Sequence, residues 1–133
     1  MTAADIPAST GCPPVAGVLT MFYYRDMERA LAWYESVMGW PHAMTLEHAA
    51  VLRINETSRL VLVGHGQGSQ RPLPGDNKGA LLSLEVADLE DWHARLIARG
   101  VPASVIVTGA GGLSREFKVK DPEDYTIEFL RWL

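Results

Sequence analysis

The segment YYRDMERALAWYESVMGW, residues 23–40, decides the fold because it joins the end of an apolar strand to an amphipathic helix. Its apolar residues recur at helical spacing, at Met27, Ala30, Leu31, Tyr34, Val37 and Met38. Asp26 stands where a helix N-cap is expected, and Gly39 stands where the helix should end. The preceding residues 17–24, GVLTMFYY, have the β-branched and aromatic composition of a strand buried on both faces. The sequence therefore opens with a strand followed by a helix.

The same pattern then returns. Three short strands are predicted after the first helix, at residues 43–47, 49–54 and 59–63. A Gly- and Pro-rich linker follows, and ALLSLEV, residues 80–86, predicts a new strand. Asp88 lies 62 positions after Asp26 and begins a second amphipathic helix, which ends at Gly100. The last three predicted strands are at residues 104–108, 115–120 and 125–130.

This internal repeat predicts an α+β fold built from two βαβββ modules. We expect a flexible leader over residues 1–16 and one domain over 17–133. Within that domain we expect module one at 17–64, a linker at 65–79 and module two at 80–133. Each helix should cover one four-stranded sheet, so the two curved sheets would present their other faces to a shared cavity.

Composition excludes several function classes. The chain has 133 residues, a formal net charge of −4 and no long apolar run, so neither a nucleic-acid partner nor a membrane span is expected. Its first residues lack the basic start and apolar core of a secretion signal. A single cysteine, Cys12, cannot form an internal disulfide, which favours a cytoplasmic location.

At this point the residues resemble a known family. Residues 23–40, the segment LEVADLEDWHARLIARGV at 84–101 and the segment DPEDYTIEFL at 121–130 resemble the vicinal oxygen chelate superfamily, which includes glyoxalases, bleomycin-resistance proteins and extradiol dioxygenases. The resemblance extends over residues 17–130. It implies paired βαβββ modules and a homodimer whose cavities are built from modules of both chains.

The metal enzymes of that superfamily hold a divalent ion with His, Gln or Glu from the first and last strands of each module. The resemblance places these positions at Leu19 and Leu62 in module one and at Leu81 and Glu128 in module two. A leucine side chain has no donor atom for a metal. We therefore expect no metal and no other cofactor at this site, and an apolar cavity floor with one carboxylate.

The remaining residues on these strand faces suggest a small organic ligand. By strand alternation, Met21 and Tyr23 share the face of Leu19, and Ser83 shares the face of Leu81. A thioether, a phenol and a hydroxyl beside leucines suit a flat, partly polar compound. A desolvated Glu128 could anchor a cationic or hydroxyl-bearing ligand, or shuttle a proton. Ordinary packing of these side chains is the alternative.

Three functions stay open on the sequence alone. The preferred one is a metal-independent binding protein that holds an aromatic or amphipathic ligand. The second is a metal-independent lyase, isomerase or cyclase with Glu128 as general acid or base, and the third is a divalent-metal-dependent lyase or dioxygenase. The third would need a displaced site, for instance with His48, His65 and Glu128, and no HxH or HExxH spacing supports one.

Overall fold

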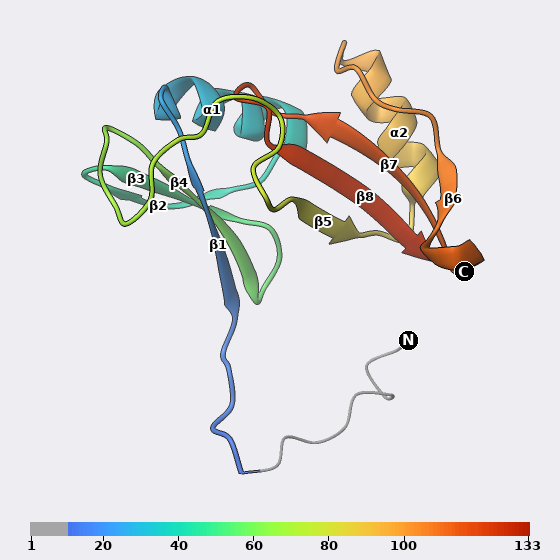
Figure 1. Cartoon of the computed structure of the whole chain (residues 1–133), viewed down its shortest axis with the longest axis horizontal. Coiled ribbons are helices and arrows are strands. Elements are labelled where there is room, and N and C mark those ends of the chain that lie inside the picture. The colour runs from blue at the N-terminus through green and yellow to red at the C-terminus, as the bar shows by residue number, and fades with distance from the viewer. Residues whose placement is uncertain (1–10) are drawn as a thin grey trace.

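The computed structural model describes residues 11–133 and contains two four-stranded sheets, each accompanied by one helical segment (Figure 1). The first half consists of β1 (Val18–Tyr23), α1 (Met27–Trp33), the π-helical η2 (Tyr34–Met38), β2 (His42–Leu46), β3 (Ala49–Arg53) and β4 (Ser58–Val63). The second consists of β5 (Leu82–Glu85), α2 (Leu89–Ala98), β6 (Val107–Gly109), the short 3₁₀ turn η3 (Ala110–Gly112), β7 (Ser114–Lys120) and β8 (Thr126–Trp132). The α+β fold with two βαβββ units is confirmed.

The two sheets have the same strand order. The first runs β1-β4-β3-β2 and the second runs β5-β8-β7-β6, with the first strand of each unit parallel to its last. The remaining pairs in both sheets are antiparallel. The repeat seen in the sequence is thus a repeat of topology.

The first helix is capped as the sequence predicts. The Asp26 carboxylate accepts a hydrogen bond from the backbone N–H of Arg29 at 3.1 Å. The helix then changes to π-helical geometry at Tyr34 and ends at Gly39, whose φ of 69° is left-handed. Asp88 occupies the N-cap of α2 but makes no side-chain capping bond there.

The strand β1 is buried on one face and not on both, which corrects the expectation from its composition. Phe22 and Tyr24 are buried in the main core, whereas Leu19 and Met21 are each 51% exposed on the opposite face. The apolar run resembles a fully buried strand because its outward face is also apolar. Among residues 11–133 of a single chain, however, no segment buries Leu19 and Met21 on that face.

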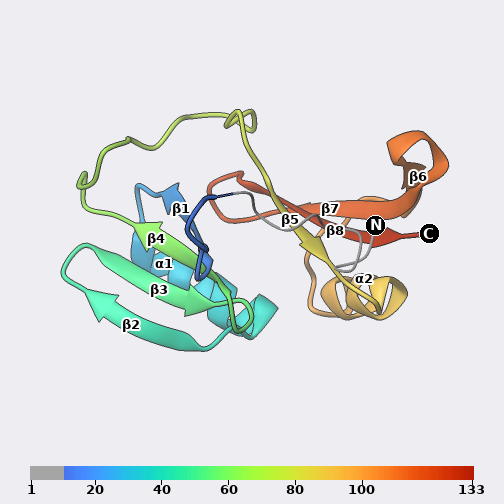
Figure 2. The ribbon, with the colours of Figure 1, turned by 90° about the horizontal axis from the view of Figure 1, so that it is seen from below.

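Within one chain the two sheets are not closed around a cavity. They lie beside one another, and the linker passes as a long arc from β4 to β5 (Figure 2). Residues 11–16 of the expected leader are exposed and carry no helix or strand, and residues 1–10 lie outside the described part of the chain. Each sheet therefore keeps one face available.

The two halves are joined by the turn between β7 and β8. Asp121, in this turn, is 4% exposed and accepts hydrogen bonds from the Tyr24 and Tyr34 hydroxyls at 2.5 and 2.8 Å. The Tyr125 hydroxyl donates to the carbonyl oxygen of Tyr23 at 2.9 Å and accepts from the Tyr23 N–H at 3.0 Å. These bonds bring residues about one hundred positions apart into a single core.

The same turn also caps the first helix. The Glu123 carboxylate accepts the backbone N–H groups of Arg25 and Asp26 at 2.7 and 2.8 Å. Asp124 adopts a left-handed φ of 69°, a conformation that aspartate tolerates better than most residues. The left-handed position of this turn is therefore occupied by an aspartate and does not need a glycine.

Candidate functional site

The open face of the second sheet carries a group of polar side chains around Glu128. Glu128 pairs in register with Ser83 on β5 and with Lys118 on β7. Its Oε1 accepts a hydrogen bond from the Ser83 hydroxyl at 2.7 Å, and its Oε2 lies 3.2 Å from the Lys118 ammonium. Glu128 and Ser83 therefore lie side by side on this face.

The Lys118 ammonium group forms ion pairs with two carboxylates. Besides Glu128, its Nζ contacts Glu116 Oε1 at 3.3 Å. Burial alone would lower the pKa of Lys118, but hydrogen bonds to Glu128 and Glu116 outweigh it and raise the pKa above the ordinary value of an ammonium group. The Glu128 side chain is only 13% exposed. The arrangement is therefore a partly buried Glu–Lys–Glu chain with a hydroxyl at one end, suited to binding polar or charged groups of a ligand.

The open face of the first sheet has the opposite character. Tyr23 packs in a small cluster with Ala49, Val51, Val61 and Val63. The register of β2 with β3 places Met44 and Leu46 on this face too, and both are at least half exposed. Leu19 and Met21 extend the same face along β1, so it is almost entirely apolar in its centre.

The choice of Leu62 as a ligand-facing residue is wrong, because Leu62 points to the other side of its sheet. It pairs with Phe22, is fully buried and belongs to the helix-covered core. Glu128 pairs with Ser83, and Met21, 62 positions before Ser83, pairs with Val61. Val61 is therefore the module-one counterpart of Glu128.

The divalent metal site of the resembled family does not fit these residues. On the strand positions concerned, Leu19, Val61 and Leu81 provide no donor atom. Glu128 is the only candidate ligand at these four positions, and both its oxygens already have partners. The residues on these sheet faces therefore do not support a reaction step that runs through a metal.

Two of the histidines do come together, but away from Glu128. His48 lies in the turn between β2 and β3, His65 follows β4, and their Nδ1 atoms are 3.0 Å apart. Among residues 11–133, no group of three or more His, Cys, Asp and Glu side chains is placed to hold a metal ion. His93 packs its ring edge against Phe117 and contacts the carbonyl oxygen of Ser104, which is a packing role.

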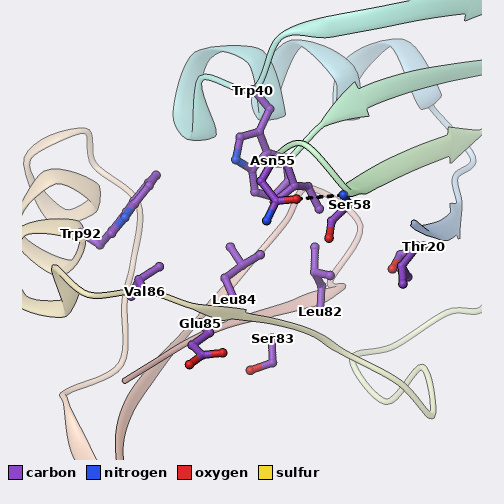
Figure 3. A pocket seen from close by; sticks show the side chains of 12 residues that line it. Thr20, Trp40, Asn55, Ser58, Leu82, Ser83, Leu84, Glu85, Val86 and Trp92 are labelled. Atoms are coloured by element: carbon purple, nitrogen blue, oxygen red, sulfur yellow. Dashed lines mark hydrogen bonds between the residues drawn. The ribbon is translucent and has the colours of Figure 1, made fainter. Parts of the chain in front are cut away.

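A cleft of about 610 Å³ separates the two halves on the other side of β5 (Figure 3). Leu82 and Leu84 point into it, and Trp40 and Trp92 border it from η2's end and from α2. Ser83 and Glu85 line its edge but point away from it (Figure 3). Thr20, Asn55 and Ser58 add polar groups to its lining, and no ionisable side chain points inward (Figure 3).

Sequence reasoning missed Lys118 and Glu116. Their signal was present, since Glu116, Lys118 and Lys120 alternate with the apolar Phe117 and Val119, which places the three charges on one strand face. Pairing of that strand with the one carrying Glu128 could not be read from the sequence. Asp121 was also missed, because a carboxylate in a polar-looking turn gives no sign that it is buried.

Paired βαβββ units with helix-covered cores and open sheet faces define a class of small α+β proteins. A sequence model described as Glyoxalase/Bleomycin resistance protein/Dioxygenase superfamily matches residues 18–129. The chain therefore belongs to this superfamily. No curated protein matches the sequence.

Solved structures share the fold. A glyoxalase/bleomycin resistance protein from Catenulispora acidiphila has 25% identity and a TM-score of 0.68, with 90% of this chain and 100% of that chain covered. A lactoylglutathione lyase from Agrobacterium tumefaciens has 20% identity and a TM-score of 0.68, over 90% and 96%. A glyoxalase/bleomycin resistance protein/dioxygenase from Nocardioides has 17% identity and a TM-score of 0.71, over 93% and 87%. In the described part of this chain, neither α-helix is long and apolar enough to cross a bilayer.

Proposed function

We propose that this protein binds a small aromatic or amphipathic organic molecule without using a metal. The observation that carries the proposal is the contrast between the two open faces. One is apolar around Met21 and Tyr23, and the other presents the carboxylate of Glu128 with the Ser83 hydroxyl and the Lys118 ammonium. A ligand with a flat apolar body and a polar or cationic end matches this contrast.

The contacts of the Glu128 carboxylate favour a role in anchoring a ligand over a role in proton transfer. A carboxylate that contacts an ammonium and accepts a hydroxyl hydrogen bond is held in one orientation, which suits electrostatic recognition. A general base must instead exchange protons readily with its substrate. Binding is therefore the better-supported function.

The two proposed binding faces are open to solvent in one chain, and we propose that a second copy of the chain covers them. Leu19 and Met21 are half exposed, and Leu81 is 43% exposed, on faces that do not meet within one chain. In a homodimer, the apolar face of module one from one copy would lie over the polar face of module two from the other. We place this activity in the cytoplasm, in line with the single cysteine.

The proposal is tested by fluorescence titration with 9-aminoacridine, a planar aromatic cation. We expect saturable binding with one site per chain, and affinity reduced about tenfold or more by Glu128→Gln, since a charge-assisted contact is lost. Glu56→Gln, in the exposed β3–β4 turn, is the matched control and should bind as the wild type does. Equal affinity in the Glu128→Gln and wild-type proteins would reject the anchoring role.

The alternative, a metal-independent lyase, isomerase or cyclase, draws on the same Ser83–Glu128–Lys118 group. It predicts that the bound compound is converted, and that Glu128→Gln abolishes conversion while the fold is retained. Mass spectrometry of the compound after incubation with stoichiometric protein separates the two functions. Recovery of the unchanged compound supports binding alone.

A further inference from the structure

We propose that His48 and His65 bind one divalent transition-metal cation, such as Zn²⁺, Cu²⁺ or Ni²⁺, between their Nδ1 atoms. The site lies at the end of the first sheet, where His48 of the β2–β3 turn meets His65, the second residue after β4. It is separate from the strand positions that bind metal in the superfamily's enzymes. Metal binding there is independent of the proposed function.

The distance between the two nitrogen atoms is close to that of a ligand pair. The Nδ1 atoms of His48 and His65 are 3.0 Å apart, with ring planes at 84° to one another. Two imidazole nitrogens bound to one tetrahedral ion at about 2.0–2.1 Å lie roughly 3.3 Å from each other. A movement of a few tenths of an ångström therefore converts the contact into a pair of metal ligands.

A carboxylate lies near the Nε2 atom of each ring, on the side away from the other histidine. The Nε2 of His65 is 2.7 Å from Glu28 Oε1, and the Nε2 of His48 is 3.6 Å from Glu47 Oε1. A carboxylate behind a metal-binding histidine holds the proton on the far nitrogen and leaves the near nitrogen free to bind the ion. Glu28 is within hydrogen-bond distance and thus orients the His65 ring with Nδ1 toward the site, whereas the contact between His48 and Glu47 is longer than a hydrogen bond.

The short distance between the two Nδ1 atoms requires either a proton or a metal cation between them. If each Nε2 keeps its proton toward its carboxylate, both Nδ1 atoms present lone pairs to each other at 3.0 Å. Such an arrangement is repulsive unless a proton or a metal cation lies between the lone pairs. Without a metal, one ring carries a proton on Nδ1, either as the Nδ1–H tautomer or as an imidazolium that also donates to its carboxylate.

The backbone holds the two rings at this place. His65 has a left-handed φ of 59°, which is unfavourable for a residue with a side chain, and the next residue, Gly66, is left-handed as well. The carbonyl oxygen of His48 accepts the N–H of Gly64 at 2.9 Å, so the turn and the end of β4 are tied together. Both histidine side chains are 39% exposed, which leaves room for water molecules to complete the coordination.

The donor set selects the class of cation. Imidazole nitrogen suits Zn²⁺, Cu²⁺ and Ni²⁺, whereas Mg²⁺ and Ca²⁺ prefer oxygen ligands. With only two protein ligands, the ion keeps exchangeable water positions. It would link the β2–β3 turn to the start of the linker, and through Glu28 to α1.

The test is isothermal titration calorimetry of the tag-free full-length protein with ZnCl₂, and separately with MgCl₂. We expect one Zn²⁺ per chain and no binding of Mg²⁺. His48→Gln and His65→Asn should each abolish Zn²⁺ binding, and asparagine is chosen at position 65 because it tolerates a left-handed backbone. Glu28→Gln should weaken binding about tenfold, as loss of an outer carboxylate does.

The matched control is His42→Gln, which removes an exposed histidine that contacts Met44 and Thr45 instead. It should leave Zn²⁺ binding unchanged, and circular dichroism should show all variants folded. Absence of Zn²⁺ binding by the wild type, retention of binding in either His48→Gln or His65→Asn, or equal binding of Mg²⁺ would overturn the proposal. Titration of 9-aminoacridine in the presence of EDTA tests the proposed function separately, because that binding should not change.

Discussion

The Tyr24 hydroxyl donates a hydrogen bond of 2.5 Å to the carboxylate of Asp121, which lies 97 positions later in the sequence. Tyr24 is 1% exposed and Asp121 is 4% exposed. Burial raises the pKa of Tyr24 and also that of Asp121, although hydrogen bonds from the Tyr24 and Tyr34 hydroxyls act against the rise at Asp121. Each group thus depends on the other to satisfy its polar atoms.

Replacing Asp121 by alanine should strongly destabilise the protein. The change removes the acceptor of two buried phenols and of the backbone N–H groups of Glu123 and Tyr125. Leaving such groups unpaired costs about 3 kcal/mol in the free energy of unfolding. Urea denaturation measures this, with Asp124→Asn as a control that keeps the left-handed turn and should change stability by less than about 0.5 kcal/mol. Similar urea midpoints for Asp121→Ala and the wild type would show that the hydrogen bonds accepted by Asp121 do not stabilise the protein.

The raised pKa of Asp121 has a consequence for pH dependence. At pH values above the ordinary pKa of 3.8, the folded protein retains a proton that the unfolded chain has released. The contribution of this group to the free energy of unfolding therefore grows as the pH falls toward 3.8, and shrinks as the pH rises through the raised pKa of Asp121. Stability of the wild type relative to Asp121→Asn, which does not titrate, should shift in favour of the wild type as the pH is lowered over this range. A pH-independent difference would show that the pKa is not raised.

Glu90 should titrate far below an ordinary glutamate. Arg131 binds both its carboxylate oxygens, at 2.6 and 3.0 Å, and Arg115 adds a contact at 3.2 Å. The Arg131 guanidinium is the main reason that the pKa of Glu90 is lowered to about 2. In an NMR pH titration, Arg131→Met should return the pKa toward 4.5, and Arg115→Met should move it less. Identical titration curves for wild type and Arg131→Met would refute this assignment.

Gly64 allows α1 to approach the end of β4. A Cβ at this position would lie 2.6 Å from the Cβ of Met27, so Gly64→Ala should destabilise the protein by about 1–3 kcal/mol. Because the clash is with Cβ, adding Met27→Gly should relieve part of this cost, whereas adding Met27→Ala should not relieve the Cβ contact. A double-mutant cycle from thermal or urea unfolding measures the coupling. Strict additivity of Gly64→Ala with Met27→Gly would argue against the close approach.

The sequence was sufficient for the topology because each element carried its own local signal. The helix around Ala30 and Tyr34 has apolar residues at helical spacing, and the repeat of Asp26 at Asp88 set both modules in register. The same local signal misjudged β1. An apolar outward face looks the same in sequence whether it is covered within the chain or left open for another molecule, as Leu19 and Met21 show.

The site was only partly predictable, because pairing between strands is not a local property. Alternation put Ser83 on the face of Leu81, and the resemblance gave Glu128, but their pairing was not predicted and Leu62 was chosen one residue away from Val61. A shift of one residue turns a strand side chain to the opposite face. The close approach of His48 and His65 depends on the β2–β3 turn meeting the end of β4, and no spacing in the sequence reveals it.

The β7–β8 turn that contains Asp121 also affects the order in which the two halves can finish folding during synthesis. All strands of the first sheet leave the ribosome before Asp121, Glu123 and Tyr125 are made. Until then Tyr24 and Tyr34 lack their carboxylate acceptor, and the backbone at the start of α1 lacks the Glu123 cap. The first half of a nascent chain is therefore an unfinished folding unit, and its final consolidation waits for docking of the second half.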